Sequence, residues 1–225
     1  MNPKLHPAHV FGFIVSALIL AGAIWVALHG PTGPIPMHFD ASGQVDRYGT
    51  RYELAAVLAG MSVLNLIVGF LTGKQADTTP DPVRQKALRS GQYVTVAIMA
   101  AVAAFISWSS LGPSAASGMT SLSGAMAFMG AVFLALGAIL GRVGPNAFIG
   151  VRTPWAFKSR LAWDKSNRLA GRLMFWTGLV GLIASPLSPQ PFGLIALTVA
   201  VVLMAIFSAY ESWRVWKNDP EAQSF

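Results

Sequence analysis

The segment 34–53 holds side chains that could do acid–base, metal-binding or recognition chemistry. An imidazole lies close to carboxylates in it, and both acid–base catalysis and metal coordination use that pairing. The spacing fits neither two ligands on one helical turn nor a tight knuckle, the usual patterns of zinc sites. We therefore predict no metal and no other cofactor, and interpret the segment as a folded polar loop that binds a ligand. The candidate ligand-binding residues are His38, Asp40, Asp46, Arg47 and Tyr48.

Local patterns predict how this segment folds. Asp40 followed by Gly43 is typical of a type I turn. Thr50 and Glu53 stand directly before an apolar run and have the spacing of a capping box at a helix N-terminus. A short strand over residues 35–39 is a further expectation.

A second polar segment, residues 142–172, combines turn residues, tryptophans and basic side chains. Gly144-Pro145-Asn146 predicts a turn. Thr153-Pro154 predicts a helix N-cap followed by proline at the first helical position. The segment should therefore begin as an irregular loop and continue as helix.

Residues 160–172 have a helical pattern, in which Asp164 and Arg168 are four residues apart and spaced to pair. Two interpretations of the whole segment carry equal weight. It anchors the bundle to anionic lipid at the membrane surface, or it forms a docking or ligand site. The candidate residues of this motif are Asn146, Arg152, Trp155, Trp163, Asn167 and Arg168.

The elements that position both segments follow from composition. Of 225 residues, 54% are hydrophobic and 11% are charged, whereas a soluble domain has about 25% charged residues. The absence of cysteine excludes disulfides, thiol catalysis and cysteine metal sites. Since a span needs about 20 apolar residues, we predict an all-α polytopic membrane bundle of about six transmembrane helices. The predicted spans are 10–28, 54–73, 91–111, 122–141, 173–187 and 192–210. The fifth is short, so its helix should begin before residue 173.

The distribution of basic residues predicts the orientation. The two termini and the second and fourth loops contain 14 of the 16 Lys and Arg, and the first loop contains the other two, Arg47 and Arg51. Cytoplasmic loops carry the positive excess, so both termini should lie inside (N-in/C-in). Loop 29–53 should then lie outside and loop 142–172 in the cytoplasm. The net charge of +7 therefore comes from basic residues on the predicted cytoplasmic face of the membrane. No direct contact with nucleic acid is expected.

Small residues are frequent in the predicted spans, and they let helices approach closely. Examples are Gly130, Gly137 and Gly141 in the fourth span, and Gly178 and Gly181 in the fifth. General packing is favoured over a dedicated dimer face.

Both polar segments carry motifs that resemble known families. Residues 36–49, which read Pro-Met-His-Phe-Asp and end in Tyr-Gly, resemble a small N-terminal membrane domain of unknown function found in many bacterial membrane proteins. Residues 144–155 read Gly-Pro-Asn-x-Phe-Ile-Gly-Val-Arg-Thr-Pro-Trp. Together with Trp163 and Asn167-Arg168, they resemble the SdpI family. The two motifs in one six-helix chain are similar to the full-length SdpI-type arrangement.

The resemblance implies a multi-pass protein of the bacterial cytoplasmic (inner) membrane that acts in immunity and sensing. Such a protein confers resistance to a secreted antimicrobial peptide. The implied partners are the lipid bilayer, a peptide toxin on the outer face and, for part of the family, a cytoplasmic repressor protein. Two regions are expected: an N-terminal two-helix membrane region, 1–90, and an SdpI-like four-helix region, 91–225.

The alternative is a small-molecule or lipid transporter or channel. Coupled transport usually places ionisable groups near the bilayer midplane, and the six predicted spans contain none, Asn65 being the most polar residue deep in a span. This argues against proton coupling but leaves a neutral pore open. The chain has no His-Glu-x-x-His motif and no Ser–His arrangement at membrane depth, so we predict that it is not an enzyme.

Overall fold

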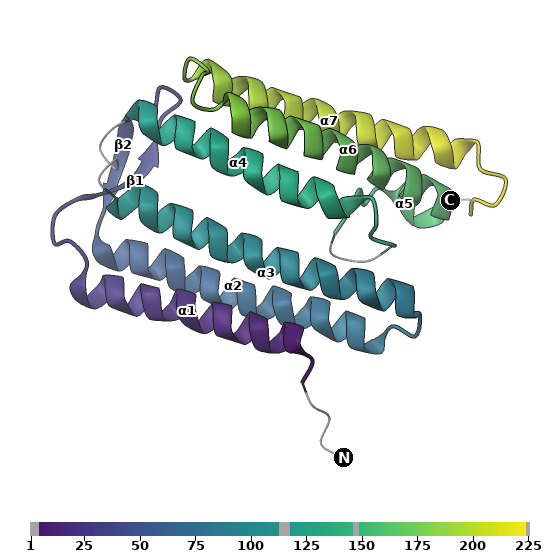
Figure 1. The fold of residues 1–225 in the computed structure, drawn as a ribbon, viewed down its shortest axis with the longest axis horizontal. Helices are drawn as coiled ribbons and strands as arrows, with labels where there is room; N and C mark the ends of the chain where they lie inside the picture. The colour runs from purple at the N-terminus through teal and green to yellow at the C-terminus, as the bar shows by residue number, and fades with distance from the viewer. Residues whose placement is uncertain (1–4, 113–117, 146–148, 224–225) are drawn as a thin grey trace. The chain divides into compact units, whose positions relative to one another are not determined.

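The computed structural model describes residues 5–112, 118–145 and 149–223. These residues form seven helices and one two-stranded sheet (Figure 1), as expected for an all-α polytopic bundle. The chain divides into two compact units. The first comprises Met1–Pro80 and Leu88–Leu122, and the second comprises Asp81–Ala87 and Ser123–Phe225.

Three helices build the first unit around an apolar core. Val15 and Ile19 on the first helix, Leu58 on the second and Val96 on the third are buried together. The first two helices lie side by side in Figure 1. The Thr50 hydroxyl caps the second helix by accepting a hydrogen bond from the Glu53 N–H at 3.3 Å, as the capping pattern predicted. The helices are α1 (Pro7–His29), α2 (Arg51–Thr78) and α3 (Pro82–Leu111), the last entering this unit at Leu88.

A β-hairpin connects α1 to α2. Strands β1 (Ile35–Phe39) and β2 (Val45–Gly49) pair antiparallel, and the expected strand at 35–39 is confirmed. The predicted turn is confirmed as well, because the Gly43 N–H donates to the Asp40 carbonyl at 2.9 Å. Gly43 has φ of 85°, a left-handed conformation that glycine adopts without strain. Ile35 is buried in the helical core, so the hairpin rests on a fixed base.

Four helices form the second unit, and two of them approach at glycines. A Cβ on Gly137 would lie 2.7 Å from the Gly171 carbonyl oxygen, and one on Gly130 would lie 2.6 Å from the Leu182 nitrogen. These glycines therefore pack two helices of one chain together, in line with the expected packing role. The helices are α4 (Gly118–Leu140), α5 (Pro154–Lys158), α6 (Arg160–Ala184) and α7 (Phe192–Lys217), with α4 entering this unit at Ser123.

Among the described residues, five helices are long and apolar enough to cross a membrane: α1, α2, α3, α4 and α7. The chain is thus a multi-pass membrane protein. As predicted, the helix of the fifth span begins before residue 173. Residues 160–172 and the apolar run after them form one continuous helix, α6, which ends at Ala184. At about 1.5 Å per residue, its 25 residues are long enough to cross a bilayer. Its first half is charged, however, and only its second half is apolar.

Candidate functional sites

The hairpin gathers four of the five outer-loop candidates on an exposed surface. His38 Nδ1 lies 2.6 Å from Asp46 Oδ1, and both side chains are largely exposed. Arg47 pairs with Glu53 at the start of α2, a role that the capping pattern did not predict for this carboxylate. Tyr48 is 56% exposed. The strand pairing therefore brings a cation, an acid–base pair and an aromatic ring onto one small element.

Asp40, the fifth candidate, shapes the turn. Its carboxylate accepts hydrogen bonds from the Ser42 hydroxyl at 2.6 Å, the Ser42 N–H at 2.8 Å and the Gln44 N–H at 2.9 Å. The bond from the Ser42 hydroxyl is the largest cause that lowers the pKa of Asp40 below its ordinary value, and the Gln44 N–H adds to it. Asp40 is therefore ionised at neutral pH and rigidifies the turn.

The hairpin presents paired polar side chains at its surface. In the part of the chain that the structure describes, no group of three or more His, Asp or Glu could hold a metal ion. His38 and Asp46 form a pair that solvent reaches. What the arrangement offers a ligand is an ordered set of donors and acceptors on a small sheet.

The second motif is organised around the indole of Trp163. This side chain is completely buried at the start of α6. Its Nε1–H donates a hydrogen bond of 2.8 Å to the carbonyl of Val143, which lies just beyond the end of α4. The ring of Phe157, on α5, packs against it with a centroid distance of 5.5 Å. Trp163 thus ties three helical elements of the second unit to one another.

Asn167, one turn further along α6, completes this support. Its side-chain oxygen accepts from the Val151 N–H at 2.7 Å, and its Nδ2 donates to the Trp163 carbonyl at 2.9 Å. Gly150 has φ of 133°, and a Cβ there would lie 2.6 Å from the Asn167 oxygen. Glycine is required at this position both by its backbone conformation and by the closeness of the side chains.

Trp163 and Asn167, two of the predicted contact residues, are buried. Their polar atoms are already bonded inside the protein, so they hold the loop in place. Arg152 and Arg168 are exposed and Trp155 is half-buried, which leaves these three available to a partner. Asn146 lies outside the described residues.

Other contacts around this loop were partly predicted. Thr153 caps α5, accepting from the Ala156 N–H at 3.2 Å, as expected. Asp164 pairs with Arg160, at 3.4 Å, whereas the spacing had suggested Arg168 as its partner. The C-terminal tail also binds here, since the Ser159 hydroxyl donates to Asp219 at 2.5 Å.

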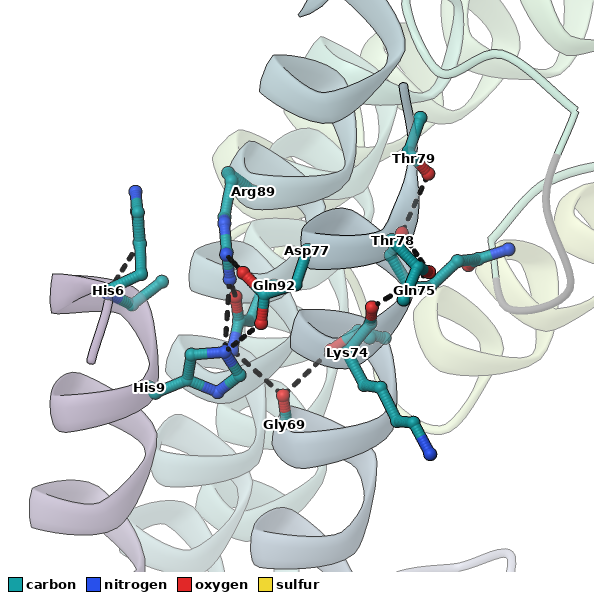
Figure 2. A network of polar contacts seen from close by, with 12 residues as sticks. His6, His9, Gly69, Lys74, Gln75, Asp77, Thr78, Thr79, Arg89 and Gln92 are labelled. Carbon is teal, nitrogen blue, oxygen red and sulfur yellow. Dashed lines mark hydrogen bonds and ion pairs between the residues drawn. The ribbon is translucent and has the colours of Figure 1, made fainter. Parts of the chain in front are cut away.

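A polar cluster in the first unit was not predicted at all. Figure 2 shows His9 of α1 pointing toward Asp77 of α2 and toward Arg89 and Gln92 of α3. His9 Nε2 lies 2.9 Å from Asp77 Oδ2, and Arg89 pairs with the same carboxylate. The Gln92 side chain accepts a hydrogen bond from Arg89 Nη1 at 3.0 Å and donates one to the Gly69 carbonyl of α2 at 2.8 Å.

The cluster is closely packed, and glycine makes room for it. His9 and Gln92 are 8% and 0% exposed. A Cβ on Gly73 would lie 2.6 Å from Gln92 Nε2 and would also collide with the His9 ring. The helices extend beyond the predicted spans, so His9, Asp77 and Arg89 lie within helices. The sequence did contain one signal. His9, Asp77 and Arg89 each lie just outside the end of a predicted span, on the side of the membrane predicted to be cytoplasmic.

A second polar contact joins α1 and α2 at membrane depth. Asn65 Nδ2 donates to the Ser16 hydroxyl at 2.9 Å, and the Ser62 hydroxyl donates to the Ser16 carbonyl at 2.7 Å. All three side chains are buried. Such bonds join helices in apolar surroundings, so Asn65 has a packing role here.

Comparison with known proteins places the second motif in a family. Residues 142–211 match the model of the SdpI/YfhL protein family. No curated protein and no solved structure matches the chain. The matched range starts at the loop held by Trp163 and Asn167 and ends within α7. The family assignment made from the motif is therefore confirmed, and the chain is a multi-pass membrane protein whose residues 142–211 belong to the SdpI/YfhL protein family.

Proposed function

We propose that this chain is an immunity and sensing protein of the bacterial cytoplasmic membrane that confers resistance to a secreted antimicrobial peptide. The observation that carries the proposal is the exposed hairpin between α1 and α2, where His38, Asp46, Arg47 and Tyr48 are presented on a base anchored by Ile35. The resemblance of the second motif to SdpI-type immunity factors, together with the family match, supports the same role.

The hairpin has the features that peptide recognition requires. Among the described residues its sheet has two strands, so both outer edges can accept a further extended chain by backbone hydrogen bonding. Tyr48 is an exposed aromatic side chain of the kind that dominates binding energy in interfaces. The Arg47–Glu53 and His38–Asp46 pairs offer charges of both signs, which complement basic and acidic side chains of a peptide.

The proposal also assigns a role to the inner face. With the predicted orientation, the hairpin meets a peptide outside, and Arg152, Trp155 and Arg168 face the cytoplasm, where a regulator such as a repressor protein can bind. The proposal needs no catalytic residue and no cofactor, and we propose that the chain is not an enzyme.

The experiment is expression of the protein in a peptide-sensitive bacterium that lacks the gene, followed by growth in a panel of membrane-active peptides. Expression should raise the inhibitory concentration of at least one peptide and leave small-molecule antibiotics unchanged. A variant with His38, Asp46 and Tyr48 replaced by Ala should reach the membrane in equal amount and protect less. Equal sensitivity with and without the protein, across the whole panel, would overturn the proposal.

The polar cluster of Figure 2 favours a second function, transport. His9, Asp77 and Arg89 are ionisable groups buried or half-buried between helices, and such groups often mark ion or proton pathways. Their position weakens this reading, because Asp77 is the penultimate residue of α2 and so lies at the end of the helix. Flux measurements in liposomes test it, with Asp77→Asn as the variant that should abolish coupled transport.

A further inference from the structure

A cavity of about 390 Å³ lies on the second unit, between the end of α4 and the middle of α6. Three glycines, Gly137, Gly141 and Gly171, are among the residues that line it. Arg142, Arg168 and Arg172 also line it. A concave site with three guanidinium groups is suited to bind an anion, because each group can donate two parallel hydrogen bonds to phosphate oxygens.

The charges of these arginines are available to a ligand. All three side chains are exposed. Asp164, one turn before Arg168, pairs instead with Arg160. Within residues 118–145 and 149–223, no carboxylate forms an ion pair with Arg142, Arg168 or Arg172. An anion bound in the cavity would therefore meet uncompensated positive charge.

An apolar groove begins where the basic cavity ends. It measures about 440 Å³ and shares Trp176 with the cavity. Its wall consists of small and aliphatic side chains of α6 and α7, with Met126 of α4. Val180, on the groove, is 63% exposed. The wall residues of α6 and α7 include Thr177, Val180, Ala184, Ala196, Leu197 and Ala200.

The two sites lie in line along α6. Arg168, Arg172, Trp176, Val180 and Ala184 recur every four residues, so they form one ridge that winds gradually around α6 and passes from one site to the other at Trp176. At about 1.5 Å per residue, the distance from Arg172 to Ala184 is about 18 Å. One leaflet of a bilayer has a hydrocarbon thickness of about 15 Å, so the path from Arg172 to Ala184 is long enough for one acyl chain. Trp176 stands between the charged and apolar parts, the position that tryptophan favours at membrane interfaces.

We propose that this surface is a binding site for a glycerophospholipid with an anionic headgroup. The phosphate lies among Arg142, Arg168 and Arg172, and one acyl chain follows α6 past Trp176 into the apolar groove. The charge complementarity and the continuity of the two sites select this occupant. A free phosphate would leave the groove empty, and an apolar peptide would leave the arginines unpaired. The site is on a different unit from the hairpin, and the inference does not depend on the immunity role.

The experiment is native mass spectrometry of the purified full-length protein, titrated with phosphatidylglycerol or phosphatidylcholine of equal chain length. Phosphatidylglycerol should bind more tightly, with one lipid retained per chain. Replacing all three arginines by Gln should weaken its binding at least about tenfold, since several charge-assisted hydrogen bonds are lost. The matched control replaces Lys74, Lys165 and Lys217 by Gln, which removes the same charge elsewhere and should change binding less than about twofold. Circular dichroism verifies that both variants keep the helical content of the wild type.

Two further measurements distinguish a lipid phosphate from free inorganic phosphate. Ala184→Trp fills the apolar groove and should weaken long-chain phosphatidylglycerol but not the dihexanoyl form. Inorganic phosphate should compete poorly with the long-chain lipid. Equal weakening by the arginine and lysine variants would overturn the proposal, because binding would then follow net charge alone. Binding of inorganic phosphate as tight as that of the lipid would overturn the lipid assignment.

Discussion

The side-chain oxygen of Asn167 accepts a hydrogen bond of 2.7 Å from the backbone N–H of Val151, sixteen residues earlier in the chain. This bond ties the irregular loop of the SdpI/YfhL region to the first turns of α6. Trp163 adds a second attachment through its bond to Val143. Trp163 and Asn167 therefore hold the loop in its shape, and the exposed Arg152 depends on that shape for its position.

Replacement of Asn167 by Leu should destabilise the protein. The change removes the acceptor for the Val151 N–H and the donor to the Trp163 carbonyl, and a buried polar group without a partner costs about 1–3 kcal/mol. The free energy of unfolding, from SDS titration in mixed micelles, should fall by that amount. Arg168→Gln, at the next and exposed position, is the control and should change it by less than about 0.5 kcal/mol. Equal stability of both variants would show that the loop is held by other contacts.

Gly137→Ala should destabilise the packing of α4 on α6. A Cβ at residue 137 collides with the backbone of Phe175 and lies 2.7 Å from the Gly171 carbonyl, and overpacking of this kind costs about 1–3 kcal/mol. Gly60 is the matched control, because a Cβ there meets no atom within 4 Å. Gly60→Ala should leave stability unchanged or raise it by up to about 1 kcal/mol. The same SDS titration compares the two, and an unaffected Gly137→Ala would contradict the observed approach of the helices.

The Arg89–Asp77 pair should stabilise the fold more than an exposed ion pair does. Arg89 is nearly buried while half of the Asp77 side chain stays exposed, so a double-mutant cycle with Leu at both positions should give a coupling of about 1.5–3 kcal/mol. The cycle for the exposed pair Arg160–Asp164 should give about 0.2–1 kcal/mol. If both cycles give the same small value, the cluster does not hold α2 and α3 together.

Local patterns predicted the structure well wherever neighbouring residues decide it. The turn at Asp40–Gly43, the Thr50 cap and the Thr153 cap each depend on a bond between residues three apart. The apolar runs likewise predicted α1, α2, α3, α4 and α7 as spans. The early start of α6 was expected because its apolar run is too short to span alone, and helical hydrogen bonding continues through the charged residues before it.

Contacts between distant residues could not be predicted. His9 and Arg89 are 80 residues apart, and only the packing of three helices brings them to Asp77. Trp163 and Asn167 were predicted as contact residues of a docking or ligand site, on a helical stretch at the membrane surface. The sequence did not predict their burial, because it results from the loop before α5 folding over α6. The orientation with both termini inside stays a prediction, as do the candidate sites.

The orientation can be tested directly, because the chain has no cysteine. A cysteine introduced at Ser42, in the exposed turn of the hairpin, should react with a membrane-impermeant maleimide on intact cells. One introduced at Lys165, on the exposed face of α6, should react only after the membrane is permeabilised. The opposite pattern would place the hairpin in the cytoplasm and remove it from contact with a secreted peptide.

The most direct measurement of the central claim is the inhibitory concentration of membrane-active peptides for cells that express the wild type or a hairpin variant. We predict that the wild type raises it at least about fourfold, or two dilution steps, for one or more peptides. Replacing His38, Asp46 and Tyr48 by Ala should remove that protection, whereas Lys165→Gln should keep it. Full protection by the hairpin variant, at equal membrane abundance, would contradict recognition by the hairpin.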